Sequence, residues 1–484
     1  MAPSLPPAVL LSVIVLLGSA SFLPVTVGTG VFKLTRKFSS KGRNLEDFRS
    51  HDSRRRGRFL NSIEISLGGV GSPTSDGLYY AQIWLGTPSQ SYHVQLDTGS
   101  DILWVNCYNC RNCPKKTDLG FNLRLYNPRE SSTGRLVACN DNFCSLTYNG
   151  EVKGCYPGVP CQYQLLYGDG SGTTGFFITD SFKYDRVIGS LKTVHENASI
   201  SFGCGAEQSG QLDGSSDAVD GIFGFGQANS SMISQLAALG KVNKMFAHCL
   251  DTQNGGGGIF TIGNVVEPKL PTTPMVPNQP HYNINLKGMA VGGNELKLPT
   301  DLFDTSGKTG TIIDSGTTLA YLPQAAIKLL MAEIVKPGMS VIESQGFSCF
   351  RYSNKVDDGF PTVSFHFVND LELKVYPHDY LFQLEDDLWC VGFQSSTSQS
   401  NDKEYFLLGD LVLTNKLVFY DLESQAIGWK EYNCSSTIGV QDAKSGSVYT
   451  VGSTNLSSLS SRLGIGSGAL FIVLISSVLN YFVH

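Results

Sequence analysis

Two copies of one short pattern constrain most strongly how this chain can fold. The pattern is an apolar residue, then Asp, Thr or Ser, Gly, and Ser or Thr, followed by an apolar run; it occurs at 96–105 and again at 313–322. Each copy is followed later by an apolar segment that ends in glycine, at 221–226 and at 406–409. Features repeated in the same order so far apart predict two duplicated lobes that meet at a pseudo-twofold axis, not a solenoid.

Short strands are expected on both sides of this repeat. Runs rich in Val, Ile, Phe and Tyr are punctuated by glycine, which accounts for 52 of the 484 residues, and long helical periodicities are few. The sequence therefore predicts an all-β fold. We expect strands at 77–86 and at 91–105, the second interrupted by 97–100, and one helix at 230–239.

Five prolines at a spacing of three, from 268 to 280, mark the expected boundary between the lobes. This spacing favours a stiff, extended connector, although a long surface loop inside one domain is the alternative. We take 71–267 as the N-terminal lobe, which includes a Cys-rich insertion, and 281–434 as the C-terminal lobe.

The chemistry of the repeat resides in Asp97 and Asp314. A carboxylate that follows an apolar strand is costly to bury unless nearby groups donate hydrogen bonds to it. Small residues after each Asp allow backbone N–H groups and hydroxyls to reach it, namely Gly99 and Ser100 in the first copy and Gly316 and Thr317 in the second. Two such carboxylates a few Å apart share one proton. One can then take a proton from a water while the other protonates a carbonyl oxygen, without a metal or a covalent intermediate.

Three motifs together resemble the pepsin-like aspartic proteases: Asp-Thr-Gly-Ser at 97–100, Tyr-Gly-Asp-Gly-Ser at 167–171 and Asp-Ser-Gly-Thr-Thr at 314–318. The resemblance covers about residues 77–432. It implies a bilobal fold with a cleft between two β-rich lobes. It also implies a monomeric endopeptidase without a cofactor, with an acid pH optimum, which cleaves peptide or protein substrates between apolar residues. Tyr167 is then expected on a hairpin flap, with its hydroxyl bonded to Trp104.

Two other functions compete with this interpretation. Some plant relatives of pepsin are catalytically inactive binding or inhibitor proteins, which usually lack a catalytic Asp or the glycine beside it. Both Asp motifs and the flap tyrosine are intact here, so we favour an active enzyme. A surface adhesion protein would leave the two Asp motifs unexplained. The net charge of -6 argues against nucleic-acid binding.

Twelve cysteines indicate an oxidising compartment. The spacing Cys107-x2-Cys110-x2-Cys113 superficially suggests a metal or iron–sulfur site, but four ligands would be needed and no histidine lies nearby. We therefore favour disulfides over a metal. The Cys-rich insertion resembles plant atypical, nepenthesin-like proteases, and the same resemblance implies a Cys349–Cys390 bridge. The other pairings stay open. His248 lies in an expected strand, and we interpret it as structural.

The N-terminus contains two expected processing segments. Residues 1–28 lack charged side chains and include an apolar run, which is typical of a signal peptide. The range 29–70 is expected to be a basic prosegment, because 29–60 holds ten Lys/Arg against three Asp/Glu, or +7, in front of a body that must then carry -13. Resemblance to the family's inhibitory prosegments supports this interpretation. Release by autocatalysis and cleavage by another protease are both open.

The C-terminus resembles an attachment signal. A polar spacer at 435–462, rich in Ser and Gly, precedes an apolar tail at 463–484 that lacks a following basic stop. This order fits a GPI-anchor signal with attachment between 445 and 458, and a retained transmembrane helix is the alternative. Sequons at Asn197, Asn229, Asn433 and Asn455 agree with secretion. We expect the protein on the extracellular face of the plasma membrane, and the resemblance implies a plant setting.

Overall fold

The computed structural model describes residues 30–36 and 79–452, apart from 118, 120, 168–169, 213–217, 253–256, 268–269, 306–308, 397–403 and 443–444. The expected signal peptide at 1–28, most of the expected prosegment at 29–70 and the tail at 463–484 lie outside these residues, as does Asn455. Within the described ranges, no helix is both long and apolar enough to cross a bilayer.

The first half of the chain is mostly strand, as its alternating apolar residues predict. In the strand at 79–85, for example, six of seven residues are at least partly buried. The strands are β1 (Gly30–Arg36), β2 (Tyr79–Leu85), β3 (Gln90–Asp97), β4 (Trp104–Arg111), β5 (Arg135–Leu136), β6 (Gln162–Leu166), β7 (Gly172–Gly189), β8 (Lys192–Ser209), β9 (Gly221–Gly224), β10 (Met245–Asp251) and β11 (Gly257–Ile262). The helices are α2 (Asn142–Thr147), η1 (Gly210–Leu212) and α3 (Met232–Ala238). The expected helix at 230–239 is thus present as α3, capped by the side chain of Ser231.

The second half likewise consists mainly of strands, with a few short helices. Its strands are β12 (Thr272–Pro274), β13 (Asn283–Ile284), β14 (Leu286–Val291), β15 (Asn294–Glu295), β16 (Thr311–Ile313), β17 (Ala320–Leu322), β18 (Ile342–Ser344), β19 (Phe347–Arg351), β20 (Val363–Phe367), β21 (Glu372–Val375), β22 (Leu381–Glu385), β23 (Leu388–Val391), β24 (Phe393–Ser395), β25 (Phe406–Leu408), β26 (Lys416–Asp421), β27 (Ala426–Glu431), β28 (Thr437–Gln441) and β29 (Val448–Gly452). Its helices are η2 (Thr300–Phe303), α4 (Gln324–Ile334), α5 (Val356–Gly359), η3 (Val368–Asp370), α6 (Pro377–Tyr380) and α7 (Asp410–Leu413). The described part of the chain is therefore an all-β fold with short helices, as predicted.

The two Asp motifs occupy equivalent places in the two halves. In the first, β3 pairs in parallel with β9, and β4 pairs with the same strand in the antiparallel direction. In the second, β16 and β17 pair with β25 in the same two directions. The glycine-ended segments of the sequence are thus the central strands of two matching arrangements. The predicted duplication and bilobal fold are confirmed.

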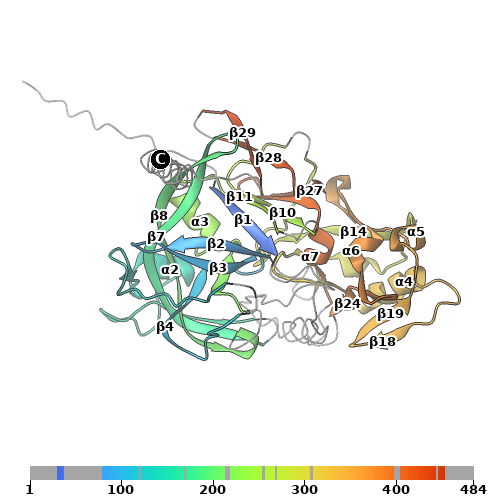
Figure 1. The fold of residues 1–484 in the computed structure, drawn as a ribbon, viewed down its shortest axis with the longest axis horizontal. Coiled ribbons are helices and arrows are strands. Elements are labelled where there is room, and N and C mark those ends of the chain that lie inside the picture. Colours follow the sequence, from blue (N-terminus) through green and yellow to red (C-terminus); the bar gives the residue numbers. More distant parts are fainter. Residues whose placement is uncertain are drawn as a thin grey trace, which may run out of the picture.

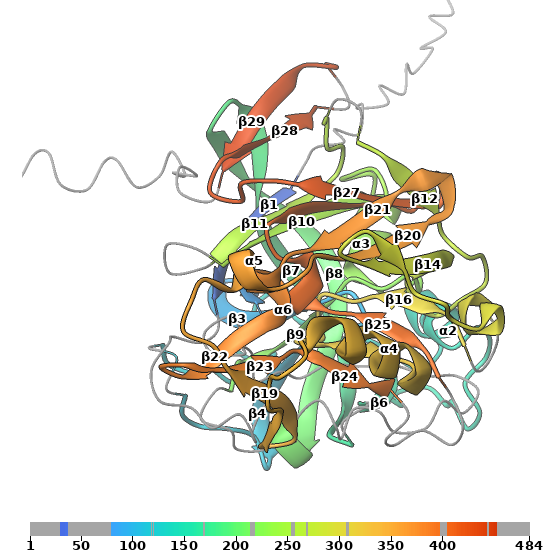
Figure 2. The same ribbon diagram turned by 90° about the vertical axis from the view of Figure 1, so that its right-hand side faces the viewer.

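One sheet joins the halves. The order β12-β27-β26-β10-β11-β1 places three strands from after residue 271 beside three from before residue 263. Figure 1 shows the early strands on one side, the late elements α4–α6 on the other, and β10, β11 and β27 between them. In Figure 2, the same shared strands lie above β16, β25 and α4. The strand β1 belongs to the range expected as a prosegment, and its backbone pairs with β11, β2 and β7.

The proline-spaced connector is built into this sheet. Residues 272–274 form β12, which pairs with β27 through Thr272 and Gly428. Met275 then bridges to Ile284, at the start of the second half. The expected extended conformation is present in this part of the connector because sheet pairing holds it, while 268–269 lie outside the described residues.

The region expected to be a polar spacer, 435–462, differs from that prediction in its first part. Strands β28 and β29 form an antiparallel hairpin. Ile438, Val440 and Val451 are buried with the Cys249–Cys434 disulfide. Apolar residues alternate with polar ones here, and alternation buries one face of a strand even in a Ser/Gly-rich segment. The body of the protein therefore extends to at least Gly452.

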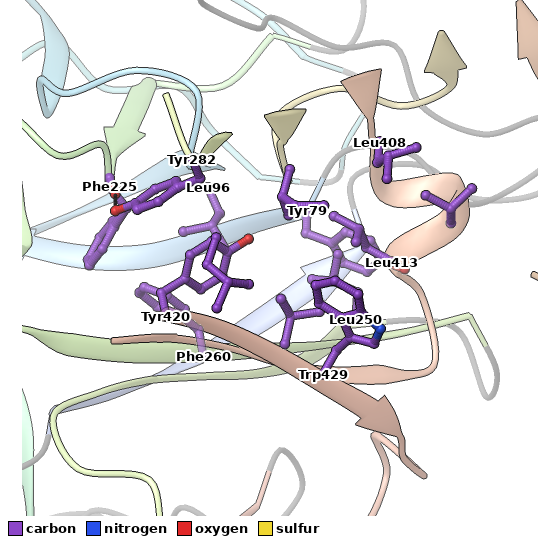
Figure 3. Packing of buried hydrophobic residues seen from close by; sticks show 14 of the residues in the cluster. Tyr79, Leu96, Phe225, Leu250, Phe260, Tyr282, Leu408, Leu413, Tyr420 and Trp429 are labelled. Atoms are coloured by element: carbon purple, nitrogen blue, oxygen red, sulfur yellow. Dashed lines mark hydrogen bonds between the residues drawn. The ribbon is translucent and has the colours of Figure 1, made fainter. Parts of the chain in front are cut away.

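A continuous apolar core runs from the first half into the second. Figure 3 shows Leu96, which precedes Asp97, and Phe225, whose N–H donates to the Asp97 carbonyl, close to Tyr282 and Tyr420 from the second half. Aromatic rings pack at this junction: those of Phe246 and Tyr420 are stacked with centroids 4.4 Å apart. This packing fixes the two Asp motifs relative to one another.

Candidate active site

Asp97 is the last residue of β3 and is fully buried. Its Oδ1 accepts a hydrogen bond from the Gly99 backbone N–H at 2.8 Å, and its Oδ2 accepts one from Ser100 Oγ at 2.5 Å. Both donors come from the loop that follows the strand, as the sequence predicts. The loop is thus folded around its own carboxylate.

Asp314 follows β16 and is also fully buried. Gly316 N–H donates to its Oδ1 at 3.0 Å, and Thr317 Oγ1 donates to its Oδ2 at 3.0 Å. The two loops touch directly, because Ser315 N–H donates to Thr98 Oγ1 at 2.9 Å across 217 residues of sequence. The structure therefore brings the two predicted aspartates together on adjoining loops with matching hydrogen bonds.

Two glycines allow the backbone of these loops to lie in close contact with the central strands. A Cβ on Gly224 would lie 2.5 Å from the backbone of Asp101 and Ile102, and a Cβ on Gly409 would lie 2.3 Å from the carbonyl oxygens of Thr317 and Leu319. No side chain fits at these distances. The glycine-ended segments are consequently part of the site's construction, not generic buried strands.

Tyr167 and Trp104 are also placed together. Tyr167 directly follows β6 and begins the turn to β7, where its N–H donates to the Ser171 carbonyl at 2.8 Å. Trp104 begins β4, directly after the first Asp loop, and its Nε1–H donates to the Tyr167 hydroxyl at 2.5 Å. Both residues are buried. The hairpin is thereby tied to the base of the Asp97 loop.

Other titratable groups lie around the Asp97 loop, and the sequence analysis did not select them. Burial raises the pKa of Asp101 to about 6, although the Ala228 backbone N–H and the Lys244 charge oppose the shift. Burial also lowers the pKa of His281 to about 4, with an opposing contribution from the hydrogen bond to the Gly99 carbonyl. The sequence could have pointed to Asp101, because it lies close to Asp97 in the chain. It could have pointed to His281 only through its position directly after the connector.

This arrangement is suited to acid–base chemistry on a bound water. Each carboxylate is held by donors that favour its charged form, and buried like charges on touching loops resist double ionisation. A pair that holds one shared proton can act as base and acid in the same step. Among the described residues, no cluster of His, Cys, Asp or Glu has the arrangement of a metal site.

The twelve cysteines form six disulfides. Cys349 is bonded to Cys390, the bridge that the family resemblance implies. The remaining bridges are Cys107–Cys204, Cys110–Cys113, Cys139–Cys155, Cys144–Cys161 and Cys249–Cys434. The Cys107, Cys110 and Cys113 sulfurs are therefore all used in disulfides.

Three of the four predicted glycosylation sites lie at the surface. Asn197 is exposed on β8, Asn229 is exposed ahead of α3, and Asn433 is exposed beside Cys434. These positions are accessible to glycosylation, which stays a prediction. His248 is buried in β10, with Nε2 3.1 Å from the Tyr420 hydroxyl, in a structural position.

Comparison with known proteins gives one family. Residues 79–264 match the family model described as xylanase inhibitor N-terminal, and residues 281–431 match the one described as xylanase inhibitor C-terminal. Aspartic proteinase 36 of Arabidopsis thaliana is 48% identical over 96% of this chain and 95% of its own length. Aspartic proteinase 39 of the same plant is 49% identical over 88% and 89%. The crystal structure of conglutin gamma, a basic 7S globulin from lupine seeds, shares the fold at a TM-score of 0.60 and 19% identity, covering 84% of this chain and 96% of that one.

Proposed function

Because the chain belongs to the plant aspartic proteinase family, we propose that it is an active aspartic endopeptidase whose catalytic pair is Asp97 and Asp314. One observation carries this proposal. The two buried carboxylates lie on loops joined by the Ser315–Thr98 hydrogen bond, and each is oriented by its own glycine N–H and hydroxyl. A catalytically inactive protein would not require both carboxylates to be buried and oriented in this way.

In the proposed reaction, the pair shares one proton and holds the attacking water between the carboxyl groups. The ionised carboxylate takes a proton from the water as the oxygen attacks the scissile carbonyl carbon. The other carboxyl gives its proton to the carbonyl oxygen, which yields a tetrahedral diol. Collapse of the diol then breaks the C–N bond: the amine leaves with a proton from one carboxyl group, and a diol hydroxyl returns a proton to the other carboxylate, which restores the shared proton. The Tyr167 hairpin covers the substrate during these steps.

A catalytically inactive inhibitor or binding protein is the second candidate. The name of the matching family models, xylanase inhibitor, favours it. The intact loops at Asp97 and Asp314 favour the enzyme, because an inhibitory function does not explain why two carboxylates are buried together.

A cleavage assay separates these candidates. We would secrete the full-length chain from a eukaryotic cell, so that the six disulfides form, and follow hydrolysis of a peptide library from about pH 3 to pH 7. We expect cleavage at acid pH between apolar residues, and its loss in Asp97→Asn and in Asp314→Asn. Asp185→Asn, an ion-paired surface residue of β7, is the matched control and should cleave like the wild type. Cleavage that survives either active-site substitution would exclude the proposed pair.

We further propose that the protein is exported and held at the outer face of the plasma membrane by a GPI anchor. Six disulfides, three exposed sequons and the apolar terminal segments support this location. Because β29 extends to Gly452, we propose an attachment residue between 453 and 458. Phosphatidylinositol-specific phospholipase C should release the protein from membranes; retention after treatment would instead indicate a transmembrane helix.

We also propose that 29–70 acts as an inhibitory prosegment. Its basic charge is complementary to the acidic body, and acidification would weaken the attraction by protonating carboxylates. Incubation of the purified precursor at about pH 4 should shorten it from the N-terminus. If Asp97→Asn is shortened equally, another protease performs the cleavage.

A further inference from the structure

His281 lies where the second half of the chain begins, directly after the last proline of the connector. Its backbone is fixed by the first half: Gln227 Nε2 donates to the His281 carbonyl at 2.6 Å. The next residue is anchored there as well, because the Tyr282 hydroxyl donates to the Phe225 carbonyl at 2.6 Å. His281 is therefore held against the segment that flanks the Asp97 loop.

The imidazole of His281 reaches the Asp97 loop itself. Its Nδ1 lies 3.2 Å from the carbonyl oxygen of Gly99. A carbonyl oxygen only accepts hydrogen bonds, so Nδ1 must carry the proton. Nε2 is buried and has no hydrogen-bond partner among the residues that the structure describes. The ring thus makes one directed contact, and that contact is with the residue whose N–H holds the Asp97 carboxylate.

We propose that His281 is a positioning residue for Asp97, and that its Nδ1–H fixes Gly99 so that the Gly99 amide stays directed at the carboxylate. The inference rests on the proposed peptidase function. Gly99 is buried and has no side chain of its own to restrain it. Two bonds hold it: the amide to Asp97 Oδ1 and the carbonyl to His281. Because His281 belongs to the second half, this contact also couples the Asp97 loop to the position of that half.

Burial supports this role. His281 is 3% exposed, and burial lowers its pKa to about 4, which favours the neutral ring above that pH. A neutral ring with a fixed tautomer positions the Gly99 carbonyl without adding a positive charge beside the pair. An ammonium or guanidinium group here would alter the charge around Asp97 as well as its geometry.

Three substitutions in the full-length protein test the proposal. The side-chain N–H of His281→Asn can replace Nδ1–H, that of His281→Gln can replace only the more distant Nε2 position, and His281→Leu has no donor. We expect kcat to fall roughly tenfold in the Leu and Gln variants, with KM within about twofold of wild type, since losing a buried hydrogen bond displaces the loop but leaves the substrate cleft intact. His281→Asn should retain most of the wild-type kcat.

Equal activity in all three variants, or an Asn variant as impaired as the Leu variant, would overturn the proposal. If His281→Leu fails to fold, the contrast between Asn and Gln decides it. A second readout is independent of catalysis: 1H–15N NMR of histidine-labelled protein should show an Nδ1–H tautomer whose signal disappears in His281→Asn. An Nε2–H tautomer would overturn the inference. A wild-type protein that shows the Nδ1–H signal but cleaves no peptide would contradict the proposed function alone.

Discussion

At the scale of single residues, the two Asp loops reach the same geometry with different side chains. Ser100 donates to Asp97, and Thr317 donates to Asp314. The loops meet asymmetrically: Thr98 accepts a hydrogen bond from the Ser315 amide, while Ser315 Oγ is buried without a partner in the described part of the chain. His281 adds a contact to the first loop from the second half. Matching roles therefore rest on the position and chemistry of a group, not on residue identity.

The buried histidine His248 gives a pH prediction at this scale. Burial lowers its pKa to about 3, whereas an unfolded chain binds a proton near its ordinary value of about 6.5. Between these values the unfolded state binds more protons, so folded-state stability falls as pH falls, by about 1.4 kcal/mol per pH unit. His281 acts in the same direction, and Asp101, whose pKa is raised, acts in the opposite one.

His248→Gln should remove the proton that this histidine takes up when the protein unfolds at acid pH. The amide of Gln can still bond to Tyr420, so the fold should survive. We expect the free energy of unfolding, measured with denaturant, to fall less steeply in the variant between about pH 6 and pH 4, by about 1.4 kcal/mol per pH unit. Above about pH 7 the two curves should run parallel, which serves as the internal control. Parallel curves at every pH would show that folding does not shift the pKa of His248.

At the scale of elements, the site depends on short strands that pass very close to one another. The strand β25 contacts both β16 and β17, and β9 contacts both β3 and β4. The strand β9 ends at Gly224 and β25 is directly followed by Gly409, and each glycine lies beside an Asp loop. The flap is a separate element, tied to the first arrangement through Trp104 and Tyr167.

Gly409→Ala tests the close approach. A methyl group would lie 2.3 Å from two backbone carbonyl oxygens, which cannot move without shifting the Asp314 loop. We expect a loss of at least about 3 kcal/mol in the free energy of unfolding, or failure to fold. Gly288→Ala is the matched control, because its Cβ would meet only the end of the flexible Glu295 side chain at 3.2 Å. Equal thermal midpoints for the two variants would contradict the steric argument.

Tyr167→Phe tests the flap. The substitution keeps the ring and removes the acceptor of the Trp104 hydrogen bond. We expect kcat/KM for peptide hydrolysis to fall about five- to tenfold, with a stability loss of about 1 kcal/mol. Tyr163→Phe makes the same change in the same hairpin, where the hydroxyl contacts Thr173 instead, and should leave kcat/KM near the wild-type value. Identical losses in both variants would show that the effect is not specific to the flap contact.

At the scale of the whole molecule, the halves are joined by shared strands, a common core and one long-range disulfide. Strands β26 and β27 return from the second half to pair beside β10. Cys249 on β10 is bonded to Cys434, just beyond β27. Shared strands and this disulfide thus attach the C-terminal part of the described chain to the first half.

The contribution of this disulfide should exceed that of the short one. Cys249–Cys434 spans 185 residues and Cys110–Cys113 spans 3. In the chain-entropy account, removing the first by a double Cys→Ala change costs about 5 kcal/mol and removing the second about 2 kcal/mol. Differential scanning calorimetry of the two double variants measures this difference. A larger loss in the Cys110/Cys113 variant would show that loop length does not decide the contribution of these bridges.

The sequence alone determined the parts of the site that are local in the chain. Asp97 and Asp314 are oriented by groups two and three residues away, so each tetrapeptide contains the donors that orient its own carboxylate. Strand alternation and glycine punctuation predicted the β class and strands at 77–86 and 91–105, which are present as β2, β3 and the start of β4. Repetition of the whole pattern predicted two halves. Tyr167 and Trp104 came from resemblance, because no local rule links residues 63 positions apart.

Only the tertiary structure decided which distant groups meet. The Ser315–Thr98 contact, the imidazole of His281 on Gly99, five of the six disulfide pairings and the place of β1 and β12 in the shared sheet all join segments that composition and spacing leave independent. The hairpin at 437–452 was missed because its burial depends on the first half, including Val265 against Val440. Local hydrogen bonds can be derived from neighbouring residues, whereas long-range contacts depend on how the two halves pack, and that packing is set by the core they share.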